Sequence, residues 1–155
     1  MEMKFSIFTQ YGQFYIADAD LNGDTGHPDF WSKDAFRDRL AITEGILGVS
    51  IENDDATANG EIVVHESKHE KTNFQNVDHV VEGSLLVKSG TLQLLDCPTF
   101  QAEITIELVA GWYRVRISSF NLAKSRQENP EDTYIIDVWK EPFSEKSVLK
   151  RWHSS

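Results

Sequence analysis

The sequence predicts an all-β domain, an antiparallel β-sandwich with one short helix near residues 33–40. Three observations support this fold class: apolar and polar residues alternate with a period of two, turn-forming dipeptides separate the alternating runs, and one segment alone has helical spacing. With 155 residues, the chain is long enough to build one domain around one sizeable core. We expect the domain to span residues 1–140, with a C-terminal extension at 141–155.

Each expected strand has one buried face, because side chains alternate between the two faces of a sheet. The residues expected on the buried faces are, in chain order, Phe5 and Ile7, Phe14 and Ile16, Val49 and Ile51, Ile62 and Val64, Ile104 to Leu108, Tyr113 to Ile117, and Tyr134 to Val138. A further hairpin is expected from Leu85–Val87 and Leu92–Leu95, joined through Ser89-Gly90. Turns are expected at Asn22-Gly23, Asn59-Gly60, Ala110-Gly111 and Asn129-Pro130.

The helix is predicted between two strands. Ser32 is a suitable N-cap, and the segment from Asp34 to Leu40 places Phe36 and Leu40 four residues apart, on one helical face, before Gly45.

The charge distribution excludes some functions. The chain has 15 Lys and Arg against 25 Asp and Glu, a net charge of −10. Eleven of the acidic residues and three of the basic ones fall in residues 18–61. Direct nucleic-acid binding needs clustered Lys and Arg, so we expect no nucleic-acid partner. A basic protein is still compatible with this charge as a partner.

The sequence also predicts where the protein acts. Its first residues lack the basic and apolar regions of a signal peptide, so none is expected, and no apolar run is long enough to span a membrane. The single cysteine, Cys97, cannot form an internal disulfide. We therefore expect a cytoplasmic protein without a membrane partner. His27, His79 and His153 stand in polar surroundings and are expected to be solvated.

Residues 65–69 spell His-Glu-Ser-Lys-His, an H-E-x-x-H sequence. On a helix, this spacing directs two histidines at a zinc ion, with the glutamate as general base. Here the motif follows a predicted strand and lacks an apolar face, which favours a polar strand end that leads into a charged loop. A zinc hydrolase that uses His65, Glu66 and His69 is the less favoured interpretation.

A second motif resembles half of a calcium loop. Asp18, Asp20, Asn22 and Asp24 follow an oxygen-ligand spacing with Gly23 at the sixth position, and Asp29 stands at the twelfth. An acidic surface loop is the favoured interpretation, so no cofactor is expected. The alternative is a calcium-dependent β-sandwich binding module that uses Asp18–Asp29. Because the sequence contains no set of acid, base and nucleophile, we do not expect an enzyme.

The most distinctive string in the sequence is Asp132-Thr133-Tyr134-Ile135-Ile136-Asp137, and Tyr11-Gly12-Gln13-Phe14 stands near the start. Together with the segments Asp29 to Ala35, Gly45–Glu52 and Gly111 to Val115, these strings resemble the competence protein J family, whose members inhibit the nuclease of bacterial DNA uptake. The resemblance implies a small cytoplasmic immunity-type protein that binds a non-specific nuclease and blocks it.

An acidic surface suits such a partner, because a nuclease presents a cationic, metal-containing cleft to phosphates. The residues expected to bind the partner are Glu52, Asp54, Asp55, Asp18, Asp20, Asp24, Asp132 and Asp137. Within the string Asp132–Asp137, Tyr134 and Ile136 are expected in the core. Occlusion of the cleft, competition for DNA and capture of the catalytic metal remain open as mechanisms.

Overall fold

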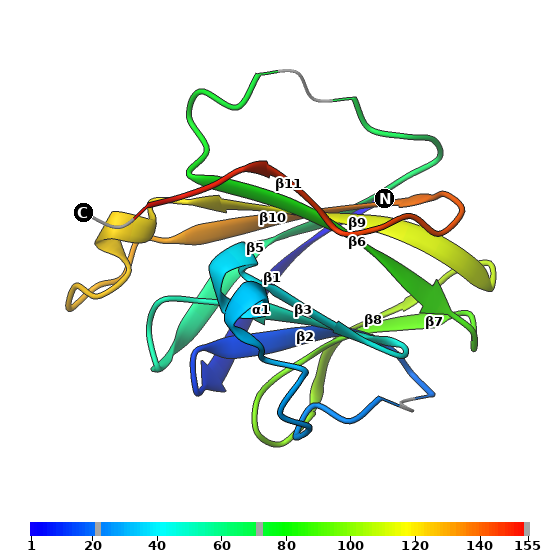
Figure 1. Ribbon diagram of the computed structural model, residues 1–155, viewed down its shortest axis with the longest axis horizontal. Coiled ribbons are helices and arrows are strands. Elements are labelled where there is room, and N and C mark those ends of the chain that lie inside the picture. Colours follow the sequence, from blue (N-terminus) through cyan, green and yellow to red (C-terminus); the bar gives the residue numbers. More distant parts are fainter. Residues whose placement is uncertain (21–22, 71–72, 154–155) are drawn as a thin grey trace.

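The computed structural model of the chain describes residues 1–20, 23–70 and 73–153. In these ranges, two β-sheets face each other, and one short helix packs beside them (Figure 1). The larger sheet has the strand order β1-β5-β10-β9-β6-β11, and the smaller one β3-β4-β2-β7-β8. The strands are β1 (Glu2–Gln10), β2 (Gln13–Asp18), β3 (Leu40–Thr43), β4 (Ile46–Ser50), β5 (Asp55–His65), β6 (His79–Val87), β7 (Thr91–Leu95), β8 (Ala102–Glu107), β9 (Gly111–Phe120), β10 (Thr133–Lys140) and β11 (Ser147–Lys150).

The predicted all-β class is confirmed, and the alternating residues form the core between the sheets. Phe14 of β2 packs against Phe5 of β1 and Tyr134 of β10, with ring centroids 5.8 and 6.1 Å away. Tyr134 and Ile136 are fully buried, as predicted. Burial of this apolar surface is the main favourable contribution to folding.

The larger sheet contains one parallel pair, β10 with β5, among antiparallel neighbours. The turn predicted at Asn59-Gly60 is wrong, because both residues lie inside β5. Gly60 is needed there for close approach, since a Cβ atom would come within 2.6 Å of the Phe5 ring.

Helix α1 (Lys33–Asp38) begins as predicted, with the Ser32 hydroxyl accepting a hydrogen bond from the Ala35 N–H at 3.1 Å. It ends two residues before the predicted Leu40, because Arg39 takes the left-handed conformation, with φ of 61°. Leu40 instead starts β3, which pairs with β4. A short 3₁₀ helix, η1 (Leu122–Lys124), follows β9.

The segment expected as a C-terminal extension contributes to the sheet. Ser147–Lys150 forms β11, which pairs with β6, and Trp152 packs against the core. The prediction of a solvated His79 is wrong, because the side chain is fully buried beside this segment. No helix in the described ranges has the length and apolar character that a bilayer crossing requires.

Candidate functional site

Exposed acidic groups gather around the β1–β2 turn at one end of the sandwich. Asp54 and Asp55 follow β4 and are exposed, and a Cβ on Gly12 would lie 3.7 Å from an Asp54 carboxylate oxygen. Residues 52–55 and Arg126 line a shallow surface groove of about 260 Å³. We call this surface, made of Tyr11, Glu52, Asp54, Asp55 and Arg126, the Tyr11 end.

Tyr11 is the prominent apolar group at this end. It has φ of 61° and is 71% exposed at the tip of the turn, with Gly12 at φ of 68° beside it. Both residues therefore adopt the left-handed conformation in the tight turn by which the chain passes from β1 of the larger sheet to β2 of the smaller one. Tyrosine is enriched at protein-binding surfaces, where aromatic anchors contribute a large share of the binding energy. The sequence marked Tyr11-Gly12 only as part of a string that resembles a family, and predicted neither the turn nor the exposure of Tyr11.

Glu52 has a structural role at the Tyr11 end. Its carboxylate accepts a hydrogen bond from the buried Arg39 guanidinium, which also donates to the Ser50 carbonyl at 2.9 Å. Arg126 lies 3.9 Å from the other Glu52 oxygen. Glu52 therefore compensates a buried positive charge, and Asp54 and Asp55 carry the freely exposed negative charge of this end.

The second predicted acidic group, Asp18, Asp20 and Asp24, lies at the opposite end of β2. Since β2 has six residues, the two groups are separated by roughly 17 Å along the strand. Asp20 and Asp24 are exposed, and Asn22 lies outside the described residues. Asp18 is buried, and its Oδ1 accepts hydrogen bonds from the Ser89 N–H and hydroxyl, at 3.0 and 2.6 Å. Asp18 therefore anchors the turn between β6 and β7.

The two aspartates of the distinctive string are both buried, Asp132 just before β10 and Asp137 within it. Asp132 accepts a hydrogen bond from the Tyr134 hydroxyl at 2.7 Å. Burial and the neighbouring Asp132 charge raise the pKa of Tyr134, so the phenol stays protonated and keeps this bond. Neither Asp132 nor Asp137 presents an exposed carboxylate to a partner.

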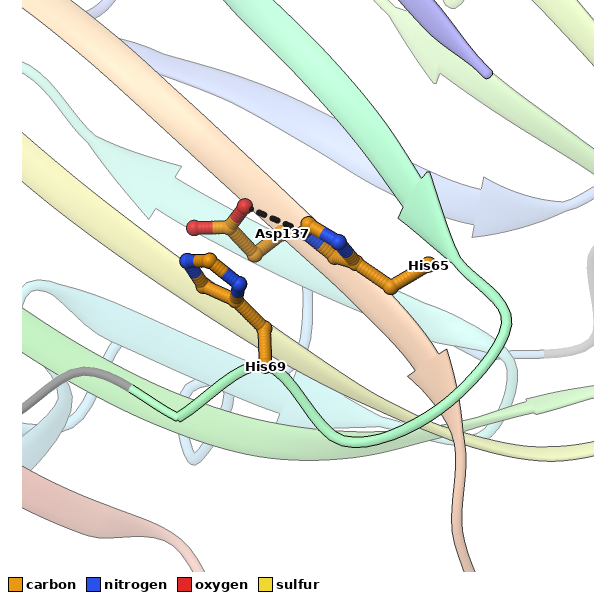
Figure 2. Close-up of side chains that lie close together, drawn as sticks. All are labelled: His65, His69 and Asp137. Carbon is orange, nitrogen blue, oxygen red and sulfur yellow. Dashed lines mark hydrogen bonds and ion pairs between the residues drawn. The ribbon is translucent and has the colours of Figure 1, made fainter.

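Asp137 instead meets the two histidines of the H-E-x-x-H sequence on the outer face of the sheet (Figure 2). His65 is the last residue of β5, and His69 follows in an irregular segment, so the motif does not form the helix of a zinc peptidase. His65 Nε2 lies 2.7 Å from Asp137 Oδ1. The two imidazole rings stack with centroids 4.3 Å apart.

This is the one group of three His, Cys, Asp or Glu side chains in the described residues whose ligand atoms come within 4.8 Å of one another. The H-E-x-x-H spacing marks both histidines in the sequence but not their contact with Asp137. That contact depends on the parallel pairing of β10 with β5, which aligns Asp137 with Val63 and Trp139 with His65. No local pattern specifies such a register.

The chain matches no protein-family model and no curated protein sequence. It is similar to the crystal structure of ComJ from Bacillus subtilis, described as an inhibitor of the DNA-degrading activity of NucA. The TM-score is 0.68 and the identity 15%, over 90% of this chain and 96% of that one. Another similar structure is that of the protein "Crocagin biosynthetic gene J", with TM-score 0.61 and 15% identity, over 91% of this chain and 97% of the other. The protein thus has a ComJ-like fold, and the family resemblance seen in the sequence is confirmed at the level of the fold.

Proposed function

We propose that the protein inhibits a non-specific nuclease by binding it through an acidic surface, without catalysis of its own. The observation that carries this proposal is the ComJ-like fold. The similarity extends over 90% of the chain, and ComJ is an inhibitor of the DNA-degrading activity of NucA. The family strings in the sequence support the same assignment. We expect the inhibitor to act in the cytoplasm and to bind protein rather than nucleic acid.

The Tyr11 end is the binding surface we propose. A nuclease active site is cationic because it must hold phosphates, so it attracts exposed carboxylates over a distance of about one Debye length, roughly 8–10 Å. Asp54 and Asp55 supply such charge beside the exposed Tyr11. Tyrosine adds apolar contact area at low entropic cost, and the carboxylates add orientation and speed of association.

Charge alone does not select the Tyr11 end, because Asp20 and Asp24 are equally exposed at the opposite end of β2. Each end also has an exposed apolar residue, Tyr11 beside Asp54 and Ile42 in a surface pocket with Asp24. We favour the Tyr11 end because Tyr11 is aromatic and 71% exposed, against 40% for Ile42. The Asp20–Asp24 group therefore provides a matched control of similar charge on the same molecule.

The test is a titration of the purified protein into DNA digestion by a nuclease encoded next to it, with magnesium in excess. Inhibition that saturates at a fixed molar ratio, together with a complex on a sizing column, is the expected result. Excess magnesium separates direct inhibition from removal of the cofactor metal. Undiminished cleavage without a complex would refute the proposal for that nuclease.

A further inference from the structure

The outer face of the larger sheet holds three metal-binding side chains that come from three places in the sequence. His65 ends β5, Asp137 lies in the neighbouring strand β10, and His69 returns from the segment after β5. Figure 2 shows the three side chains converging, with His65 and His69 on two sides of the Asp137 carboxylate. The parallel pairing of β5 with β10 holds the first two ligands on rigid strands.

The convergence is not an exposed acidic cluster. Asp137 is 5% exposed and the two histidines are half-buried, so the donor atoms are partly shielded from water. The His65 and His69 rings stack on each other, and the three ligand atoms lie within 4.8 Å of one another. Zinc binding therefore requires the two nearly parallel rings to rotate about their side-chain bonds, so that one nitrogen of each points at the ion. Tetrahedral zinc with bonds of about 2.0–2.1 Å requires donors roughly 3.4 Å apart.

We propose that His65, His69 and Asp137 bind a zinc ion. Two neutral imidazoles and one carboxylate form a donor set that zinc and related divalent transition metals prefer, whereas calcium and magnesium prefer oxygen donors alone. Three protein ligands leave a fourth position for water or another small ligand. The His65–Asp137 hydrogen bond gives way to two metal–ligand bonds when zinc binds.

The charges around the site permit a cation. Arg116 on β9 lies opposite Asp137 in register, but its Nε donates to Glu82 at 2.8 Å, and Glu82 also pairs with Arg114. Glu82 thus offsets part of the positive charge next to the site. Arg116 Nη1 is buried and has no hydrogen-bond partner among the described residues. Water or an anion at the fourth zinc position would add an acceptor to this face of the sheet.

Zinc in this position would connect the segment after β5 to the sheet, because His69 is the one ligand outside a strand. Glu66 is exposed and does not belong to the donor group. The site therefore differs from an H-E-x-x-H peptidase centre: its third ligand comes from a neighbouring strand, and the glutamate of the motif takes no part.

The test is a titration of zinc chloride into protein that has been stripped of metal with a chelator. We expect one zinc per chain, a higher melting temperature with zinc, and visible absorption bands of tetrahedral cobalt when cobalt chloride replaces zinc. His69→Ala should weaken zinc binding at least about 100-fold, because loss of a direct ligand exceeds the 10–100-fold effect of losing an outer partner. Since His69 is half-buried and lies outside the strands, this variant should fold.

Matched controls distinguish this site from adventitious binding. Glu66→Gln, His27→Ala and His153→Ala alter exposed residues outside the cluster, and each should leave zinc affinity unchanged. The proposal is overturned if the stripped protein takes up no stoichiometric zinc. It is also overturned if His69→Ala binds zinc as tightly as the unaltered protein, or if His27 or His153 accounts for the binding.

Discussion

The backbone N–H of Trp152 donates a hydrogen bond to Nδ1 of His79, 73 residues earlier, at 3.0 Å. On the other side of the ring, His79 Nε2 donates to the Asp38 carbonyl at 2.8 Å. Because an N–H can only donate and a carbonyl can only accept, these partners select the neutral imidazole with its proton on Nε2. His79 thereby joins the end of α1 to the C-terminal segment inside the protein.

Stability should therefore fall as the pH drops from 7 to 5. Burial is the largest cause that lowers the pKa of His79, from 6.5 to about 4. Between these two pKa values, the unfolded chain binds a proton that the folded protein excludes, so acid favours unfolding. The loss between pH 7 and 5 is about 2 kcal/mol, with a slope that approaches about 1.4 kcal/mol per pH unit below pH 6. Urea denaturation at several pH values measures it.

The control for this prediction is His79→Asn, which keeps an acceptor but does not titrate in this range. Its free energy of unfolding should be lower at pH 7 and much less dependent on pH. Burial raises the pKa of Asp38, but the hydrogen bonds from Lys146 and Arg151 outweigh it and lower the pKa. The stability that Asp38 provides is therefore lost only below about pH 4, outside the range compared. Equal pH slopes for the two proteins would contradict the assignment to His79.

Glu52→Gln should destabilise the fold, whereas Asp54→Asn with Asp55→Asn should not. Glu52 compensates the buried Arg39, and loss of one partner of such a pair costs on the order of 3 kcal/mol. Asp54 and Asp55 are exposed and do not pair with a buried charge, so their replacement should change the free energy of unfolding by less than about 0.5 kcal/mol. Thermal and urea denaturation measure the free energy of unfolding of each variant. Equal stabilities would mean that Arg39 finds another partner.

Neutralisation of Asp54 and Asp55 together should slow association with the nuclease about tenfold at low salt, and weaken the salt dependence of the rate, because steering acts on the on-rate. Asp20→Asn with Asp24→Asn removes the same charge at the opposite end of β2 and should have a much smaller effect. Stopped-flow association at several salt concentrations measures both rates. A larger effect of the control pair would place the binding surface at its end of the sandwich.

Tyr11→Ala should change the dissociation rate of the complex with the nuclease rather than the association rate. Loss of a central aromatic anchor typically costs about 2 kcal/mol of binding, and this cost is expressed mainly as faster dissociation, here about 30-fold. Because Tyr11 is exposed, its removal should leave the melting temperature nearly unchanged. Surface plasmon resonance with the nuclease immobilised gives the dissociation rate. An unchanged rate would exclude Tyr11 from the interface.

Millimolar calcium should leave the melting temperature unchanged. Asp18, the first ligand of the apparent calcium loop, is buried and already accepts two hydrogen bonds from Ser89. A ligand that binds the folded state alone would raise the melting temperature. Scanning calorimetry with calcium and with chelator provides the comparison. Stabilisation that disappears in Asp20→Asn with Asp24→Asn would instead support a calcium-dependent module.

Local patterns predicted most of this fold, because strand alternation and turn dipeptides are encoded within a few residues. The errors occur where distant segments decide the structure. Asn59-Gly60 has the composition of a turn, but Gly60 is required by the crowding of Phe5 and Tyr134. His79 stands in a polar sequence, yet Asp38 and Trp152 bury it. Distant segments also decide the candidate sites. They bury some of the predicted aspartates and leave others exposed, and the register of β5 with β10 brings Asp137 to His65.

The strand order of the larger sheet also constrains how the chain folds. β5 lies between β1 and β10, and β6 lies between β9 and β11, so each of these two strands has a neighbour from the last quarter of the chain. The sheet therefore cannot be completed during synthesis until those late strands leave the ribosome. Closing such long loops slows folding, which for sheet proteins of this kind takes milliseconds to seconds. During that time, β5 exposes an unpaired edge, and a nascent chain at this stage is open to association with other chains.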